Sequence, residues 1–405
     1  ARAPAPSRVM MRFDDLFLKG LDTLAGQGRL RSCRDWGAEA GAFLRRGADG
    51  PRVVDFSSND YLGLRTHPLL AERGAEWGRR FGSGSGASRL VTGTMPATRA
   101  LEARLAALKG MQAARIFSSG WQANASLVPA LVALSRQVTG VPAIVLVDKL
   151  IHASLYQGCA AAGVRPVRFR HNDMEHLRTL LEQAEGPGLR LILTESVFSM
   201  DGDRADMEAL HSLAQEYNAF LCVDEAHATG ILGPQGKGLV AGRADLVVGT
   251  FSKALGCMGA FVAASEAVCR WLENAASGFV FSTAPSPLVL GSVDAALDRL
   301  ADMDEARAHV AGLANLFRER MTGQGFDVGP STTQIVPVLV GQEAETLALA
   351  RAVEQAGFLA VAIRPPTVPP GACRLRVVLH AHHTREQVEA LATAITQARR
   401  SLSHD

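Results

Sequence analysis

The feature of this sequence that most restricts its fold is a series of short apolar runs separated by spans of helical character. Runs of this length are typical of buried strands, and strands that alternate with helices form βαβ units with a mostly parallel sheet. We therefore predict an α/β fold in which a mostly parallel central sheet is flanked by helices. The runs are Arg115–Phe117, Ala143–Val147, Leu191–Thr194, Phe220–Val223 and Leu246–Thr250.

A second pattern begins near residue 297. Apolar residues at helical spacing predict one long amphipathic helix that leaves the sheet, and a capping box, Thr384-x-x-Gln387, predicts the start of the last helix. We therefore predict an N-terminal arm over residues 1–50, a large domain over 51–296 and a smaller C-terminal α/β domain over 297–405, with a linker near 290–300. The helical residues are Leu297, Leu300, Val310, Leu313, Phe317 and Met321. The segments that follow are a strand at Ile335–Val340, a helix at Glu343–Gln355, and strands at Val361–Ile363 and Arg374–Leu379.

The composition excludes several classes of protein. The 42 Lys+Arg against 40 Asp+Glu leave a net charge of +2, which lacks the basic excess of nucleic-acid-binding proteins. The six cysteines are scattered and form no C-x-x-C pair, which favours a reduced, cytoplasmic protein. The first residues contain no apolar signal-peptide core. Two uncharged stretches, Ile116–Ser135 and Ala275–Val293, contain Pro and Gly and fit a buried core better than a membrane span.

Small or reactive residues follow each strand-like run of the large domain. In an open parallel sheet, ligands bind beyond the carboxyl ends of the strands. We therefore expect these residues to converge on one site. They are Ser118–Gly120, Asp148 with His152, Glu195 to Ser199, Asp224 to His227, and Thr250 to Lys253.

Two of these positions carry groups suited to amine chemistry. Lys253 has small or apolar neighbours, and loss of water favours a neutral, nucleophilic amine; the alternative is an ordinary surface lysine. Asp224 ends a buried strand and needs a partner such as a protonated pyridine nitrogen, unless it caps the next helix. Asp224–His227 also spells the DEAH box of helicases. We exclude that function because the chain has no G-x-x-x-x-G-K-[ST] phosphate loop.

Three further motifs concern ligand binding. Ser118–Trp121 lies between a strand and a predicted helix, where backbone amides bind phosphate. Gly82–Ala87 matches a dinucleotide-binding pattern, but the helical span before it favours a flexible loop that closes over the site. His152 either stacks on a planar ligand or packs structurally. The other histidines match no zincin spacing, and we predict no metal site.

The order of these elements is that of fold-type I pyridoxal-phosphate enzymes: a phosphate turn, a stacking histidine, an Asp-x-x-His pair and a lysine after a strand. Longer segments resemble the α-oxoamine synthase family within that group, from about residue 20 to near the C-terminus. The resemblance implies a fold-type I transferase, pyridoxal 5'-phosphate as the cofactor, and a homodimer with shared active sites. The segments are Phe56–Gly63, Gly84–Gly93, Thr194–Asp203 and Gly249–Gly256.

The resemblance also implies a role for each matching residue. Lys253 would hold the cofactor and move protons at the substrate Cα, while Asp224 would pair with the pyridinium nitrogen. His152 would stack on the ring and contact the substrate, and His227 would lie near the ring hydroxyl. The other cofactor residues implied are Ser119, Gly120, Trp121, Glu195, Ser199 and Thr250, with Ser282 and Thr283 reaching the phosphate in the other subunit of the dimer. The other substrate residues implied are Asn59, Arg364 for the amino-acid carboxylate, and Arg31 and Thr367 for the acyl group.

One segment points to a subgroup of the family. Ala362–Gly371, followed by Arg374-Leu375-Arg376, is similar to members that condense L-alanine with a pimeloyl thioester in biotin synthesis. The thioester would be carried by CoA or by an acyl carrier protein. Two alternatives stay open at this point. One is another α-oxoamine synthase that uses glycine or serine with a different acyl-CoA, and the other is a non-catalytic binding or scaffold protein on the same fold.

Overall fold

The computed structural model describes residues 12–402, so the first part of the predicted N-terminal arm, residues 1–11, lies outside the described residues. The chain divides into one compact unit that ends at Val53 and a second that starts at Val54. The predicted boundary between a large and a C-terminal domain at residues 296 and 297 stays a prediction. No helix among residues 12–402 is long and apolar enough to cross a membrane.

The first unit contains a helix and a small hairpin. Helix α1 (Asp14–Gly26) begins with two acidic residues, which favour a helix N-terminus. Strands β1 (Trp36–Ala38) and β2 (Phe43–Arg46) pair antiparallel. Strand β3 (Arg52–Asp55) crosses the boundary of the units, and its last two residues pair parallel with β12 (Phe358–Leu359).

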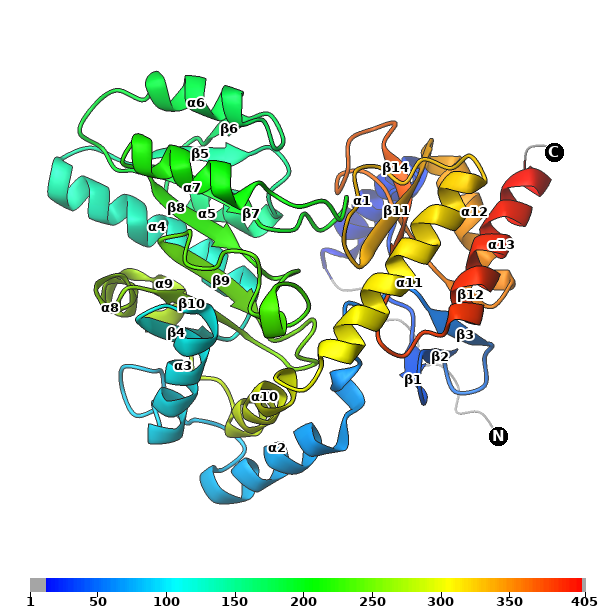
Figure 1. Cartoon of the computed structure of the whole chain (residues 1–405), viewed down its shortest axis with the longest axis horizontal. Coiled ribbons are helices and arrows are strands. Elements are labelled where there is room, and N and C mark those ends of the chain that lie inside the picture. Colours follow the sequence, from blue (N-terminus) through cyan, green and yellow to red (C-terminus); the bar gives the residue numbers. More distant parts are fainter. Residues whose placement is uncertain (1–11, 403–405) are drawn as a thin grey trace. The chain divides into compact units, whose positions relative to one another are not determined.

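The second unit contains the predicted central sheet, which has seven strands among the described residues (Figure 1). The order is β4-β10-β9-β8-β7-β5-β6, and the pairs from β9 to β6 are parallel. Strand β10 is antiparallel to both neighbours, so β4 runs in the same direction as β9. The prediction of a mostly parallel sheet is confirmed, while β6 and β10 were not predicted. The strands are β4 (Ala113–Phe117), β5 (Ile144–Asp148), β6 (Val167–Phe169), β7 (Arg190–Glu195), β8 (Phe220–Asp224), β9 (Leu246–Thr250) and β10 (Ala260–Ala264).

Both faces of this sheet are buried, which explains why its strands are continuous apolar runs. In β8, Cys222 belongs to the core cluster on the side of α4, whereas Leu221 and Val223 belong to the cluster on the side of α6 and α7. The same alternation occurs in the neighbouring strands. Polar side chains are consequently displaced to the strand ends. The helices of this part are η1 (Leu64–Thr66), α2 (Pro68–Phe81), α3 (Pro96–Lys109), α4 (Gly120–Thr139), α5 (Ala153–Ala161), α6 (Met174–Glu182), α7 (Met207–Glu216), η2 (Pro234–Gly236), α8 (Glu266–Ala275) and α9 (Ser277–Val280).

The predicted long helix beyond the sheet is wrong, because the structure has two helices there. They are α10 (Pro287–Leu300) and α11 (Asp304–Gly323), so the expected linker at 290–300 lies within α10. The buried guanidinium of Arg307 donates to the carbonyls of Leu300 and Gly230, at 2.5 and 2.9 Å. These bonds satisfy the carbonyl of Leu300 at the C-terminus of α10 and stabilise the interruption between α10 and α11.

The predictions for the remaining elements are confirmed. A second sheet has the order β11-β14-β13, all antiparallel, and α11 lies beside the last helix (Figure 1). The capping box forms, since the Thr384 N–H donates to Gln387 Oε1 at 3.0 Å and the Gln387 N–H to Thr384 Oγ1 at 3.2 Å. The elements are β11 (Ile335–Gly341), α12 (Glu343–Gln355), β13 (Val361–Ile363), β14 (Cys373–Val378) and α13 (Arg385–Leu402).

Candidate active site

A cavity of about 210 Å³ lies at the carboxyl ends of β7, β8 and β9. Its wall contains most of the residues assigned to the cofactor from the sequence. This is the place expected for a ligand on a parallel sheet. The predicted residues that line it are Ser119, Gly120, Trp121, His152, Glu195, Asp224, His227, Thr250 and Lys253.

Lys253 lies in the turn after β9 and supplies the amine of this cavity. Burial lowers the pKa of the Lys253 amine, and the nearby carboxyl groups of Asp224 and Glu195 oppose this effect. A lowered pKa increases the neutral fraction of the amine, which is the form that attacks a carbonyl carbon.

Asp224 is the buried carboxylate at the end of β8. It accepts two hydrogen bonds of 2.8 Å, from Nδ2 of Asn124 and from the Ala226 N–H. Glu195 is its partner in the register of β7 and β8, and burial together with the charge of Asp224 raises the pKa of Glu195 well above its ordinary value. Burial and the neighbouring carboxylate therefore both favour the protonated form of Glu195.

Two histidines approach the cavity from different elements. His152 precedes α5 and its Nδ1 accepts from the Ser154 N–H at 3.2 Å, while its ring lies edge-on to Trp121 at 6.0 Å between centroids. His227 is buried, and its Nδ1 lies 2.5 Å from the hydroxyl of Tyr61. Burial lowers the pKa of both imidazoles, so both are neutral at pH 7.

The N-terminus of α4, where the sequence predicts a phosphate site, lies in the wall of the cavity. Ser119 is the N-cap and its Oγ accepts from the Gln122 N–H at 3.1 Å. Thr250 also lines the cavity, and its Oγ1 donates to the carbonyl of Gly259 at 3.0 Å. Free amides at a helix N-terminus favour a phosphate.

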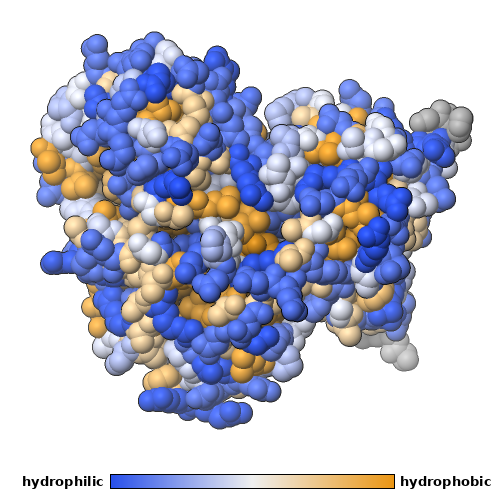
Figure 2. All heavy atoms as spheres, viewed as in Figure 1, coloured by the Kyte–Doolittle hydropathy of each residue, from blue (hydrophilic) through white to orange (hydrophobic). Residues whose placement is uncertain are grey.

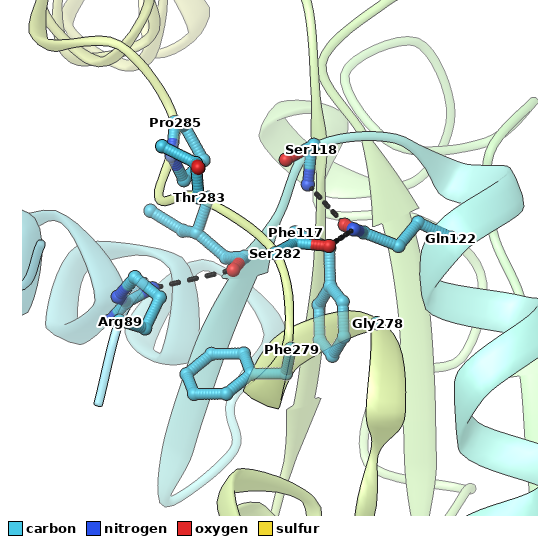
Figure 3. Close-up of a pocket in the computed structure, with 10 residues that line it drawn as sticks. Arg89, Phe117, Ser118, Gln122, Gly278, Phe279, Ser282, Thr283 and Pro285 are labelled. Carbon is cyan, nitrogen blue, oxygen red and sulfur yellow. Dashed lines mark hydrogen bonds between the residues drawn. The ribbon is translucent and has the colours of Figure 1, made fainter. Parts of the chain in front are cut away.

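Ser282 and Thr283 line a second, smaller cavity next to this helix N-terminus (Figure 3). Figure 3 shows Gln122 between Ser118 and Ser282: its Oε1 accepts from the Ser118 N–H at 2.8 Å and its Nε2 donates to Ser282 Oγ at 2.7 Å. Arg89 lies on the far side of this cavity, where it forms a buried ion pair with Glu102.

The remaining predicted residues lie outside the wall of the main cavity. Ser199 and Asn59 are joined by Arg376, whose Nε donates to the Ser199 carbonyl at 2.6 Å and whose terminal nitrogens donate to Asn59 Oδ1 at 3.1 Å. Arg364 forms an ion pair of 2.6 Å with Glu343, and Thr367 is exposed. Arg31 belongs to the first unit.

Four residues at the site were not predicted as site residues. Asn124 and Ser154 are buried within α4 and α5, Tyr61 contacts His227, and Arg376 bridges Ser199 and Asn59. A polar side chain in an apolar helical stretch is the signal that Asn124 offers in the sequence. Arg376 belongs to a segment that carries the family resemblance, but the resemblance implies no role for this residue.

The residues of the cavity fit pyridoxal phosphate. The group has an aldehyde for the Lys253 amine, a ring nitrogen that can pair with Asp224 when protonated, a planar ring and a phosphate. The Oε1 atom of Glu195 is buried without a hydrogen-bond partner among the described residues, as expected of a wall that faces a polar group. The described residues contain no cluster of three His, Cys, Asp or Glu side chains arranged to hold a metal ion.

Known proteins resemble this chain over nearly its whole length. Residues 51–395 match the family model for aminotransferase class I and II. The 8-amino-7-oxononanoate synthase of Gluconacetobacter diazotrophicus is 54% identical over 394 residues, which cover 96% of this chain and 98% of that protein.

Two solved structures have the same fold. A high-resolution structure of serine palmitoyltransferase (SPT) with pyridoxal phosphate (PLP) superposes with a TM-score of 0.87 at 26% identity. The match covers 98% of this chain and 100% of that one. The crystal structure of 8-amino-7-oxononanoate synthase from Francisella tularensis superposes with a TM-score of 0.72 at 25% identity and covers 87% and 99%. The chain therefore belongs to the class I and II aminotransferase family, as a pyridoxal-phosphate-dependent acyltransferase of the α-oxoamine synthase group related to 8-amino-7-oxononanoate synthase.

Proposed function

We propose that this enzyme condenses L-alanine with a pimeloyl thioester to give 8-amino-7-oxononanoate, the free thiol and CO2, as a cytoplasmic step of biotin biosynthesis. The observation that carries the proposal is the convergence of Lys253, Asp224 and His152 on one cavity in a chain 54% identical to a named 8-amino-7-oxononanoate synthase. The reaction forms a bond between the alanine Cα and the acyl carbon, breaks the thioester C–S bond, and breaks the bond from Cα to the carboxylate.

Pyridoxal phosphate supplies an electron sink that stabilises negative charge at the alanine Cα. Lys253 removes the Cα proton and later returns a proton to the same carbon, for which its lowered pKa is suited. The Asp224 carboxylate would pair with the ring nitrogen and favour its protonated form. His152 lines the cavity and would orient a planar ligand, and the N-terminus of α4 would hold the phosphate.

The substrate residues follow from the family resemblance. Arg364 would bind the alanine carboxylate through its guanidinium fork once it exchanges Glu343 for the substrate, because both are carboxylates. Asn59, which accepts hydrogen bonds from Arg376, would contact the substrate. Arg31 and Thr367 would contact the acyl chain.

We further propose that the enzyme is a homodimer in which Ser282 and Thr283 reach the cofactor phosphate of the other subunit. Large apolar side chains are exposed near them, with Phe281 at 84% and Val91 at 74%. The segments that carry these side chains are adjacent, since Ser88 and Thr283 form an isolated antiparallel bridge. Exposed apolar side chains on neighbouring loops are typical of a protein interface.

The test is an assay of the purified protein with pyridoxal phosphate, L-alanine and either pimeloyl-CoA or a pimeloyl carrier protein, with the product identified by mass. We expect 8-amino-7-oxononanoate with the wild type. Lys253→Ala should lose turnover and the visible absorbance of the bound cofactor, whereas Lys237→Ala, at an exposed lysine, should keep both. Full activity of Lys253→Ala would refute the assignment.

A second candidate is another reaction of the same group. It is favoured by one observation, the higher TM-score of the SPT structure than of the Francisella enzyme, 0.87 against 0.72. Replacing L-alanine with glycine or L-serine, in parallel with a panel of acyl-CoA chain lengths, separates the two. The proposed function predicts the highest kcat/KM for L-alanine with the pimeloyl donor.

A further inference from the structure

A buried chain of hydrogen bonds joins Asp224 to His152. Nδ2 of Asn124 donates to Asp224 Oδ2 at 2.8 Å and to Ser154 Oγ at 3.0 Å. Ser154 Oγ lies 2.7 Å from His152 Nδ1, and the Ser154 backbone N–H also donates to that nitrogen at 3.2 Å. Asn124 and Ser154 are buried, so solvent does not compete for these bonds.

The groups at the two ends of this chain of hydrogen bonds determine which atom donates and which accepts in each bond. Ionised Asp224 can accept but cannot donate, so the Asn124 amide must present its nitrogen to it. That nitrogen uses its second hydrogen on Ser154 Oγ. At the other end the Ser154 backbone N–H can only donate, so His152 Nδ1 must accept from it and the Ser154 hydroxyl donates to the same nitrogen. Nδ1 therefore accepts from both the hydroxyl and the backbone N–H of Ser154, and it cannot carry a proton itself.

The cost of this arrangement is visible at Asn124. Its Oδ1 is buried and has no hydrogen-bond partner among the described residues. Rotating the amide would place Oδ1 against the Asp224 carboxylate, where two acceptors repel. The structure thus leaves one buried acceptor unsatisfied, which is unfavourable, and keeps the orientation in which the amide nitrogen bonds to Asp224 and Ser154.

A close approach of two helices makes the chain possible. Gly158 of α5 faces α4, and a Cβ at this position would lie 2.9 Å from the Asn124 carbonyl oxygen and 3.0 Å from the Val128 side chain. The absence of a side chain lets α5 approach α4 closely enough for Ser154 to reach Asn124.

We propose that Asn124 and Ser154 are positioning residues that hold His152 as the neutral tautomer with its proton on Nε2. The imidazole then offers an N–H donor on the ring edge away from Ser154, in the wall of the cavity. The charged and titratable groups that face it are Asp224, Lys253, Glu195 and His227. The proposal deepens the proposed function, but the state of His152 is a property of the protein before any cofactor or substrate binds.

The test is made on the whole apoprotein labelled with ¹⁵N-histidine. Two-bond ¹H–¹⁵N correlation spectra distinguish the tautomers, and His152→Asn identifies the signals of His152. We expect a single Nε2–H pattern in the wild type from pH 6.5 to 8. Ser154→Ala and Asn124→Ala should shift it toward the averaged pattern of two exchanging tautomers, with the remaining preference for Nε2–H coming from the Ser154 backbone N–H. Ser154→Thr, which keeps the hydroxyl, should restore the single pattern.

Ser135→Ala is the matched control, because Ser135 is also buried in α4 but bonds to Val141 and Leu189 instead. The wild-type pattern should persist in it. An Nδ1–H or doubly protonated His152 in the wild type would overturn the proposal, as would an unchanged pattern in folded Ser154→Ala. Because no substrate is present, failure here is distinct from failure of the alanine and pimeloyl assay.

Discussion

Lys109 and Glu225 form a buried ion pair directly beside Asp224. Nζ of Lys109 donates to Glu225 Oε2 at 2.7 Å, to Thr229 Oγ1 at 2.8 Å and to the Lys237 carbonyl at 2.9 Å, so its hydrogens are all used. The other Glu225 oxygen accepts backbone N–H groups of the loop that follows. The pair joins α3 to the segment after β8 and thereby supports the position of Asp224.

Removing one partner of this pair should be strongly destabilising. Lys109→Met leaves the Glu225 charge buried without a counter-ion, and we expect the free energy of unfolding to fall by about 3–5 kcal/mol. Urea denaturation measures it. The exposed Lys149→Met should change it by less than about 0.5 kcal/mol, and a similarly small effect of Lys109→Met would contradict the role of the pair.

His171 should make stability depend on pH. Burial alone would lower the pKa of this imidazole, but hydrogen bonds to Asp148 and Asp203 outweigh burial and raise the pKa to about 9, from 6.5. The folded state therefore binds the proton more tightly than the unfolded state. Its contribution is complete below pH 6.5 and is lost as the pH rises through 9.

The corresponding measurement is urea unfolding at intervals from pH 6 to 10. His171→Asn should flatten the decline of the unfolding free energy over this interval. His211→Gln should keep it, because that imidazole bonds to the Arg243 carbonyl instead of to carboxylates. An identical pH slope in wild type and His171→Asn would show that the two carboxylates do not hold the proton.

At the scale of elements, the contact between α4 and α5 is the one that brings site residues together. Gly158→Ala should destabilise the protein by about 1–3 kcal/mol, because the new methyl group meets the backbone of α4 and α5 must move. Gly312→Ala in α11 is the matched control, since nothing lies within 4 Å of its added Cβ, and it should stabilise by about 0.5–1 kcal/mol. Both values come from denaturation midpoints. Equal effects in the two variants would mean that the helices are free to separate.

The elements that the sequence predicted well are those whose pattern is local. Strands β7, β8 and β9 lie within one or two residues of their apolar runs, because burial on both faces makes the run continuous. Strand β10 was missed since Ala260–Ala264 is rich in alanine, which has no strong preference for strands. The break between α10 and α11 depends on Arg307, whose partner Gly230 is distant in sequence, so helical spacing cannot reveal it.

The residues of the candidate site also fall into those that the local sequence predicts and those that it does not. Lys253, Asp224 and Glu195 could be predicted because parallel strands bring their carboxyl ends to one edge. Asn124 and Arg376 could not, since their roles depend on packing between segments far apart in the chain. Helices contain many polar residues, and the packing of distant segments decides which of them faces a cavity.

On the scale of the whole molecule, the face seen in Figure 2 is mostly hydrophilic with smaller hydrophobic areas. If the exposed apolar residues around Phe281 form the dimer surface, Phe281→Asp should give a folded monomer with much reduced activity. Val138→Asp, at another exposed apolar position with 71% exposure against 84% for Phe281, should remain dimeric and active. Sedimentation velocity with a parallel activity assay makes the comparison. A dimeric Phe281→Asp variant would place the interface elsewhere.

The burial of both faces of the central sheet also limits how this enzyme can acquire new specificity. A substitution inside β8 or β9 must satisfy two hydrophobic layers at once, whereas a substitution in the segments just beyond those strands meets the cavity alone. A library of all single substitutions, selected for growth on an altered amino-acid or acyl donor, should therefore yield its gains in the loops after the strands. In the evolution of this fold, we expect changes of substrate to arise from substitutions in the short connecting segments, while the strand sequences stay nearly constant.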